Sequence, residues 1–163
     1  MQFLIFSDSH GNHFPMVNVI RQHPDITNVL FLGDGLADVE RLFAMFPQHV
    51  FRCVRGNMDF FIMREAEDTD LFTLFGCRVM MMHGHLAGVK SSTAVAEKRA
   101  CEAGARVLLY GHTHRPECRY LSDEGLYVFN PGSIGRPYDG KSSYGLMDVL
   151  PDGSVMLSHG EVK

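Results

Sequence analysis

Short apolar runs recur along the chain, and most are followed by a polar segment that contains glycine. Such runs are typical of strands buried on both faces of a sheet. Where a short turn separates two runs, the pattern predicts a hairpin. The expected strands are residues 3–6, 29–32, 50–54, 71–75, 78–82, 107–110, 118–121, 126–129, 145–150 and 154–158.

Three segments instead carry apolar residues at helical spacing or are rich in alanine. They lie between Pro15 and Pro24, over residues 36–46, and over residues 91–103, where Gly104 supplies a C-terminal cap. In the first part of the chain strands alternate with helices, which predicts a parallel sheet covered by helices. The later hairpins predict a second sheet. We therefore expect an α/β fold in which two sheets pack together with helices on the outside.

Length and composition fit one soluble domain spanning residues 1–163, with 45% hydrophobic residues and a formal charge of −4. No basic block is present, so a nucleic-acid partner is not indicated. No apolar run approaches the ~20 residues of a membrane span, and the start of the chain lacks signal-peptide features, so we expect a cytoplasmic protein without membrane contact. The 12 Phe and 10 Met leave apolar surface for a homo-oligomer, a dimer or a tetramer.

Five of the expected strands end in side chains that can bind metal ions. Ligands of open α/β sheets gather at the carboxyl ends of strands, and side chains at i and i+2 of an extended segment point to the same side. One such pair is expected by chance in a surface loop, whereas this repetition beside glycines indicates one site. Mixed imidazoles and carboxylates suit Mn, Fe, Zn, Ni or Co. The residues are Asp8, His10, Asp34, Asn57, Asp59, His83, His85, His112 and His114.

Six motifs follow one another in a fixed order along nearly the whole chain. They are Asp8-Ser9-His10, Gly33-Asp34, Gly56-Asn57-x-Asp59, His83-Gly84-His85, Gly111-His112-Thr113-His114 and Asn130-Pro131-Gly132-Ser133. This set resembles the calcineurin-like metallophosphoesterases, and most of all their small prokaryotic phosphodiesterases of the YfcE type. The resemblance implies a four-layer α/β/β/α sandwich and a metal-dependent phosphoesterase, with a small phosphodiester as the expected substrate.

The resemblance also implies a centre of two divalent metal ions, with manganese as the first expectation and Fe, Zn, Ni or Co as alternatives. A hydroxide bridging the two ions would attack phosphorus in line with the leaving alkoxide. Two divalent ions, two carboxylates and one hydroxide leave a net positive charge, which suits an anionic phosphate. One ion would be bound by Asp8, His10 and His114, the other by Asn57, His83 and His112, and Asp34 would bridge them.

One position departs from the family pattern. Many members carry a histidine after the Gly-Asn pair, proposed to protonate the leaving oxygen or to orient the phosphate, and here that position is Met58. Without a general acid, a factor of roughly 10²–10⁴ in rate is missing. Asp59, His85 and His13 are the candidate substitutes, in that order. Asp59 has an alternative role, which is to fix the backbone of the metal-binding loop.

Other polar residues have simpler interpretations. We expect structural or surface roles for His23, His49 and His159, and we place Asp38 on the exposed face of its helix. Arg136, just after the Pro-Gly-Ser loop, is a candidate contact for substrate phosphate. Two alternative functions also stay open. One is a non-catalytic scaffold that binds protein partners, as a retromer subunit of this fold does, and the other is a nuclease or nucleotide phosphatase.

Overall fold

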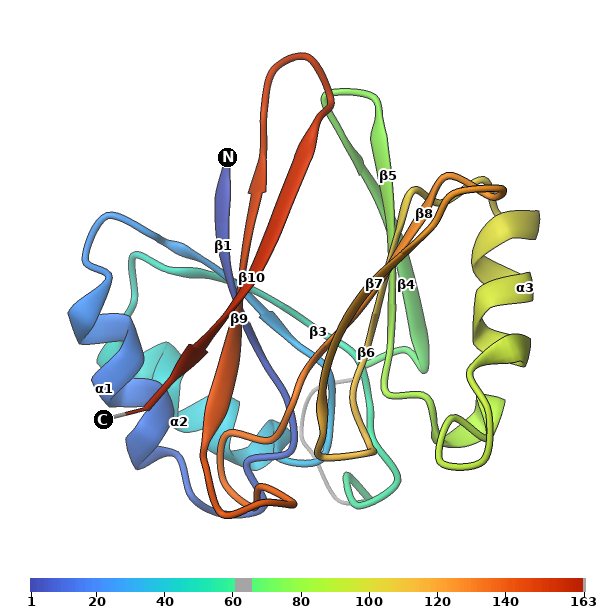
Figure 1. Cartoon of the computed structure of the whole chain (residues 1–163). Coiled ribbons are helices and arrows are strands. Elements are labelled where there is room, and N and C mark those ends of the chain that lie inside the picture. The colour runs from blue at the N-terminus through green and yellow to red at the C-terminus, as the bar shows by residue number, and fades with distance from the viewer. Residues whose placement is uncertain (61–65, 163) are drawn as a thin grey trace.

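Two five-stranded mixed β-sheets face each other, and helices cover their outer faces (Figure 1). This arrangement is seen in a computed structural model, which describes residues 1–60 and 66–162. The strand orders are β10-β9-β1-β2-β3 in the first sheet and β4-β5-β6-β8-β7 in the second. The predicted α/β/β/α layering is therefore confirmed.

The first sheet combines a parallel half with an antiparallel half. In the parallel half, β1 (Gln2–Phe6), β2 (Asn28–Phe31) and β3 (Val50–Cys53) lie side by side in sequence order. In the other half, β9 (Ser143–Val149) pairs antiparallel with β1 and is followed by β10 (Val155–Glu161). The last hairpin of the chain thus closes against its first strand.

The second sheet has a parallel centre and antiparallel edges. Its centre is formed by β5 (Cys77–Met82), β6 (Val107–Tyr110) and β8 (Leu126–Pro131). The edges are β4 (Thr69–Leu74), which pairs with β5, and β7 (Pro116–Leu121), which pairs with β8. Each predicted hairpin is present, with ends that differ by a few residues from the predicted ones.

The helices begin and end close to the predicted residues. On the outer face of the first sheet lie α1 (Phe14–Gln22) and α2 (Leu36–Met45), and on that of the second lies α3 (Ala94–Glu102), as Figure 1 shows. A short 3₁₀ turn, η1 (His85–Ala87), precedes α3. In the part of the chain that the structure describes, no helix is long and apolar enough to cross a membrane.

Three apolar layers hold these elements together, and they explain the uninterrupted apolar strands. Leu4 and Phe6 of β1 pack toward α1 and α2, whereas Ile5 packs toward the second sheet. In β6, Leu109 faces the first sheet and Leu108 faces α3. Because both faces of these strands are covered, Phe3–Phe6 of β1 and the whole of β6 are apolar.

The expectation for Asp38 was wrong. Its side chain lies on the first turn of α2 and is only 2% exposed. The first turn of this helix meets the loop after β1, and Asp38 Oδ2 accepts hydrogen bonds from Ser9 Oγ (2.6 Å) and the Gly11 amide (2.8 Å). Helical spacing alone cannot reveal this burial, because the covering loop comes from a distant part of the chain.

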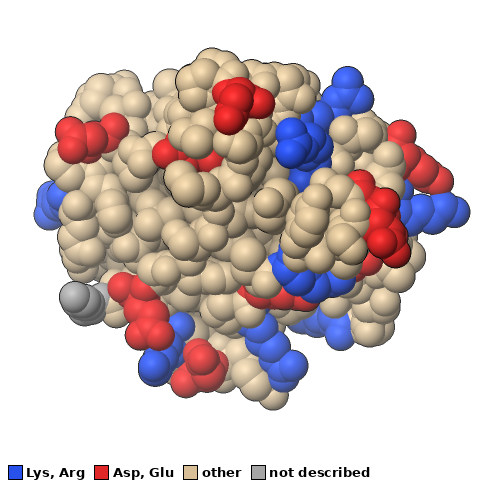
Figure 2. Space-filling view, turned by 45° about the horizontal axis from the view of Figure 1, so that its top comes forward, with Lys and Arg blue, Asp and Glu red and all other residues tan. Residues whose placement is uncertain are grey.

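Charged side chains are mixed over the face drawn in Figure 2. Lys and Arg stand beside Asp and Glu around a broad uncharged area, and no continuous basic stripe crosses the described residues on this face. Charges of both signs are therefore interspersed on this face.

Candidate metal centre

The polar loops that follow five strands meet at one edge of the two sheets. The loops after β1, β2 and β3 come from the first sheet, and those after β5 and β6 come from the second. Hydrogen bonds between these loops connect the two sheets, because the His112 amide donates to Asp8 Oδ2 and His83 Nδ1 donates to the Leu32 carbonyl. The seven predicted metal ligands, Asp8, His10, Asp34, Asn57, His83, His112 and His114, all lie at this edge.

Asp8, His10 and His114 form the first cluster of candidate ligands. The Nε2 atoms of the two histidines are 3.1 Å apart. Asp8 Oδ1 lies 3.2 Å from His114 Nε2 and 3.7 Å from His10 Nε2. One carboxylate oxygen and two imidazole nitrogens therefore converge on one point.

Asp34, His83 and His112 form the second cluster, and Asn57 joins it. His83 Nε2 lies 3.0 Å from His112 Nδ1, 3.2 Å from Asn57 Oδ1 and 3.5 Å from Asp34 Oδ2. The same Asp34 oxygen is 3.9 Å from His10 Nε2 in the first cluster. Asp34 therefore lies between the two clusters, where a bridging ligand is expected.

Asp8 provides a test of whether metal ions fit this centre. Its Oδ2 accepts hydrogen bonds from Ser7 Oγ (2.6 Å) and the His112 amide (3.0 Å). Its Oδ1 is buried and has no hydrogen-bond donor among the described residues. A buried carboxylate oxygen without a partner is costly, and a cation at this point satisfies it. The donor set of imidazoles, carboxylates and an amide oxygen fits a transition-metal ion.

Hydrogen bonds to backbone carbonyls orient two of the imidazoles. His83 Nδ1 donates to the Leu32 carbonyl (2.8 Å), and His114 Nδ1 donates to the Arg136 carbonyl (2.6 Å). When the ring is neutral, a proton on Nδ1 leaves the lone pair on Nε2. In both residues Nε2 faces the centre, so the backbone selects the tautomer that binds a metal.

The backbone at the candidate ligands is strained. Positive φ angles occur at Asp8 (57°), His10 (48°), Asp34 (59°), His112 (67°) and His114 (58°). Among the described non-glycine residues, only Phe75 shares this conformation. Each such residue costs about 1 kcal/mol or more and persists where the surrounding structure enforces it, as at ligand-binding sites.

Two glycines allow the loops to approach each other closely. A Cβ on Gly56 would lie 2.2 Å from Asp34 Oδ1, and a Cβ on Gly111 would lie 2.0 Å from Ser7 Oγ. Neither contact is sterically possible without moving a loop. Glycine is therefore needed at these two positions, because any larger residue would keep the loops apart.

Electrostatics keeps key ligands in their metal-binding forms. Burial opposes a charge on Asp34, but the hydrogen bond and charge of His83 outweigh it and lower the pKa of Asp34 to about 2. Burial and the charge of His83 lower the pKa of His112 to about 4. Burial also acts against a charge on His83, whereas its hydrogen bond with Asp34 raises the pKa of His83. At neutral pH Asp34 is therefore an anion and His112 is neutral.

Comparison with known proteins agrees with this geometry. The family model for the calcineurin-like phosphoesterase superfamily domain matches residues 1–152. The chain belongs to this superfamily. A relative from Bacillus subtilis, the probable metallophosphoesterase YsnB, is 31% identical over 158 residues, which cover 96% of this chain and 89% of the relative. The Escherichia coli phosphodiesterase YfcE is 36% identical over 72 residues, which cover 44% of this chain and 34% of that protein.

Solved structures show the same fold. A Streptococcus pneumoniae protein, described as a predicted phosphoesterase, aligns with a TM-score of 0.76 at 24% identity and covers 98% of this chain and 97% of its own. Vps29 from Entamoeba histolytica, solved with Zn²⁺, aligns with a TM-score of 0.75 at 22% identity, and each chain is covered completely (100%). At these identities the likeness concerns the fold. The superfamily's metal dependence is thus matched by two candidate ligand clusters in this chain.

The two candidate acids of this phosphoesterase have different surroundings. The Asp59 carboxylate accepts hydrogen bonds from the amides of Asp34 (2.8 Å), Gly35, Leu36 and Gly56 (2.9 Å each). Both of its oxygens therefore hold the loop of the bridging ligand and the start of α2.

His85 lies instead beside the second cluster. Its ring centroid is 5.4 Å from that of His83 and 6.1 Å from that of His112. Its Nδ1 is buried and has no hydrogen-bond partner among the described residues. Burial and the charge of His83 lower the pKa of His85.

Two further residues concern the general acid: Met58, at the position where many family members carry histidine, and His13, the third candidate. The Met58 amide donates to Asp34 Oδ1 (2.7 Å), while the Met58 side chain is 60% exposed. The His13 ring stacks on Phe14, with its Nδ1 3.4 Å from Arg41 Nη1, so it lies at the start of α1.

Two residues that support the centre were not identified from the sequence. Asp38 anchors the loop after β1, as described above. Asn130 Nδ2 donates to the Gly111 carbonyl (3.0 Å) and to Thr113 Oγ1 (3.1 Å), and thereby fixes the histidine pair after β6. The signal available for Asn130 was its place in the Asn-Pro-Gly-Ser motif, which supported the family resemblance but gave Asn130 no role of its own.

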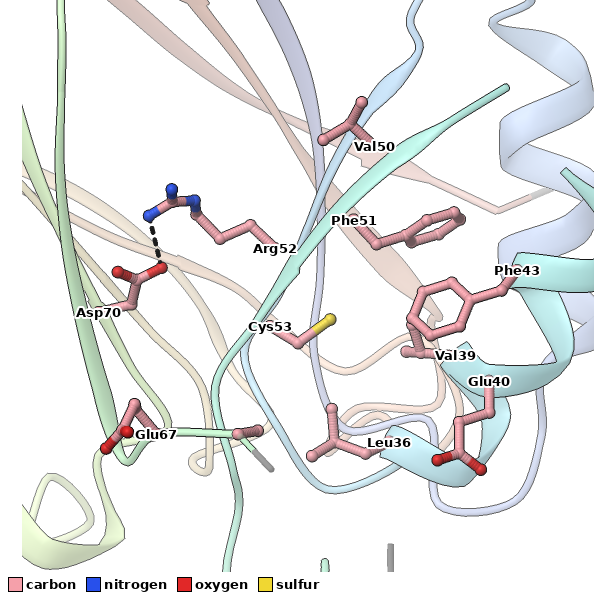
Figure 3. A pocket seen from close by; sticks show the side chains of 11 residues that line it. Leu36, Val39, Glu40, Phe43, Val50, Phe51, Arg52, Cys53, Glu67 and Asp70 are labelled. Carbon is pink, nitrogen blue, oxygen red and sulfur yellow. Dashed lines mark hydrogen bonds and ion pairs between the residues drawn. The ribbon is translucent and has the colours of Figure 1, made fainter. Parts of the chain in front are cut away.

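A hollow of about 420 Å³ lies away from the metal centre, between α2, β3 and the segment that leads into β4 (Figure 3). Its apolar wall includes Leu36, Val39 and Phe51, and Arg52 Nη1 reaches Asp70 Oδ2 at 2.7 Å on its polar side. None of the candidate metal ligands lines this hollow. It is therefore separate from the candidate metal centre.

Proposed function

We propose that this chain hydrolyses phosphodiesters with two divalent metal ions held at the centre described above. The observation that carries this proposal is the pair of candidate ligand clusters joined by Asp34, together with the buried Asp8 Oδ1, which has no hydrogen-bond donor among the described residues. One ion would be held by Asp8, His10 and His114, the other by Asn57, His83 and His112. Asp34 would contact both.

When bound, two metal ions lower the pKa of a coordinated water and neutralise charge on a phosphoryl group. The residues of this chain prepare the site for that chemistry. Asp34 remains an anion between the clusters, and His112 remains a neutral donor. The Leu32 and Arg136 carbonyls hold His83 and His114 with Nε2 toward the centre.

Manganese is the first candidate metal. Each cluster mixes nitrogen and oxygen donors, which favours a first-row transition metal over calcium or magnesium. Thiolate ligands are absent from both clusters of described residues, so soft-metal chemistry has no support there. Iron, zinc, nickel and cobalt would accept the same donors.

We favour His85 over Asp59 as the group that protonates the leaving oxygen. Four backbone amides occupy the Asp59 oxygens, and this arrangement supports a positioning role. His85 has an unpartnered nitrogen among the described residues, beside the second cluster. Imidazoles are the commonest general acids near neutral pH.

The test uses protein dialysed against a chelator and then supplied with Mn²⁺. Hydrolysis of bis(p-nitrophenyl) phosphate is expected only after the metal is added. Asp34→Asn and His112→Ala are each expected to lower kcat by more than about 100-fold, because they remove candidate ligands. Asp123→Asn, in the exposed turn between β7 and β8, is the matched control and should leave kcat unchanged.

Metal analysis of the same variants makes the test decisive. The wild type should hold two equivalents of metal, and Asp34→Asn should hold fewer. If Asp34→Asn retains full metal content and full rate, the centre has been assigned to the wrong residues.

A partner-binding scaffold is the second candidate function. The observation that favours it is Met58, whose thioether cannot donate a proton, at a position where many relatives carry histidine. The filled set of candidate ligands argues against it. A chain that binds no metal, and stays inactive when Mn²⁺ is added, would support the scaffold.

A further inference from the structure

Two cavities border the candidate metal centre on different sides. One, of about 400 Å³, is lined by His10 and Asp34 and extends to Met58 and Phe60. The other, of about 450 Å³, is lined by His112 and His114, and the two cavities share no lining residue. A phosphodiester has two substituents on phosphorus. A phosphate at the centre would therefore have one cavity available for each substituent.

The second cavity is cationic. Besides the two histidines, its lining includes Lys90, Arg115 and Tyr138, and none of its lining residues carries a carboxylate. Neither Lys90 nor Arg115 makes an ion pair with any described residue. The Arg115 guanidinium lies over the Tyr138 ring, 3.8 Å from its centroid. Two positive charges thus face this cavity without a neutralising partner.

The protein holds these cationic residues in place. Lys90 follows Val89, which is 5% exposed and packs into the core under α3. The Val89 amide donates to the Gly84 carbonyl (3.3 Å), just after the ligand His83. On the other wall, the Tyr138 amide donates to the His114 carbonyl (3.3 Å). Both walls are therefore tied to segments that carry candidate ligands.

Lys90 shares this cavity with two candidate ligands. His112 and His114 line it together with Lys90, so an anionic group bound there would lie beside both the ammonium group and the metal centre.

The first cavity has the opposite character. Met58 is 60% exposed and Phe60 is 75% exposed, and Ala37 adds a third apolar side chain to the lining. Arg136 is the one cation in this lining, and it is outnumbered there by the carboxylates of Asp34, Asp38 and Asp59. This side therefore suits an uncharged or aromatic substituent better than an anionic one.

We infer that the cavity of Lys90 and Arg115 is a subsite for a second anionic group, a phosphate or a carboxylate, on one arm of the diester substrate. The other arm faces Met58 and Phe60. This inference rests on the proposed phosphodiesterase function. Arg115 can bind such a group through two parallel N–H donors, and Lys90 adds a point charge. The difference in charge between the two cavities would therefore determine the orientation in which the substrate binds.

The test compares three diesters with the same p-nitrophenyl leaving group. Their second arm is a short alkyl chain that ends in a methyl, a carboxylate or a phosphate group. In the wild type, kcat/KM should be about tenfold higher for the diesters with an anionic arm than for the diester with a methyl arm, because their KM is lower. This preference should weaken with added salt. Preference for phosphate over carboxylate would identify which anion the subsite serves.

Lys90→Met and Arg115→Met should each reduce the ratio of anionic to methyl kcat/KM, and the double variant should bring it close to one. Lys98→Met is the control, because Lys98 lies on α3 and pairs with Glu102 (3.8 Å), away from the centre. The inference is overturned if the wild type shows no preference, or if the preference survives in the double variant.

A binding measurement separates this result from failure of the proposed function. Phosphonate analogues of the methyl and phosphate diesters resist hydrolysis, and calorimetry gives their affinities for the Mn²⁺-loaded wild type and double variant. If no diester is hydrolysed, the proposed function fails. A tighter wild-type affinity for the phosphate-bearing analogue, lost in the double variant, would still support the subsite, and equal affinities would refute it.

Discussion

Single residues at this centre were predictable where chemistry decides their type. Histidine and aspartate after a buried strand have few roles other than binding, and these residues together with Asn57 gave nine candidates. The family resemblance then implied which seven of them would be metal ligands. The left-handed backbone of Asp8, His10 and Asp34 could not be anticipated, because non-glycine residues adopt it only when tertiary contacts enforce it. Asp38 was wrongly predicted to be exposed for a related reason, because a loop from a distant part of the chain buries it.

Asp59→Asn tests whether this residue positions the bridging ligand. An amide nitrogen in place of one oxygen would face backbone N–H donors of Asp34 and Gly56 instead of accepting from them. We expect the free energy of unfolding to fall by about 1–3 kcal/mol. Mn²⁺ affinity should fall by roughly 10–100-fold, as for other residues that support metal ligands.

The rate distinguishes the two roles of Asp59. If Asp59 only positions Asp34, excess Mn²⁺ should restore kcat in the variant. A kcat that stays low at saturating Mn²⁺, with the loss greatest for poor leaving groups, would instead make Asp59 the general acid.

His85→Gln tests the preferred general acid. A leaving group of low pKa needs no protonation, so hydrolysis of a p-nitrophenyl diester should change by only a few-fold. Hydrolysis of an alkyl diester should fall by roughly 10²–10⁴-fold, and the acidic limb of its pH profile should change. Equal losses for both leaving groups, together with lost metal, would show that His85 acts on the metal site instead.

Elements were predictable where the pattern is local. Continuous apolar runs located the strands, and helical spacing located α2 to within one residue at its end. The pairing of β9 with β1 was not predictable, because the two strands lie at opposite ends of the chain and no local pattern specifies their contact. The start of α3 at Ala94 was also missed, since tight turns after η1 occupy residues 88–92.

Asp38→Ala tests the link between α2 and the loop that carries His10. Asp38 accepts hydrogen bonds from Ser9 Oγ and the Gly11 amide, so the change removes a buried acceptor. We expect dialysed protein to lose about 1–3 kcal/mol in urea unfolding. Asp25→Ala, at an exposed position, is the control and should change stability by less than about 0.5 kcal/mol. A loss of stability of the same size in the control would show that the link between Asp38 and the loop after β1 does not account for the effect.

At the scale of the whole molecule, the centre joins the two sheets. Asp8, His10, Asp34 and Asn57 follow strands of the first sheet, whereas the three remaining histidine ligands follow strands of the second. Each cluster takes ligands from both sheets. An ion bound to either cluster would therefore stabilise the contact between the two halves of the fold, and metal binding would be coupled to folding.

Metal binding should accordingly raise the melting temperature in two separable steps. At a free Mn²⁺ concentration 100 times Kd, one site contributes about 2.7 kcal/mol, or roughly 5–10 °C in a chain of this size. His114→Ala should remove the ion shared with Asp8 and His10, and His112→Ala should remove the ion shared with Asn57 and His83. Each variant should keep one equivalent of metal and part of the thermal shift. If either variant loses both ions, Asp34 couples the clusters so tightly that neither fills alone, and the histidine pair serves a single cooperative unit.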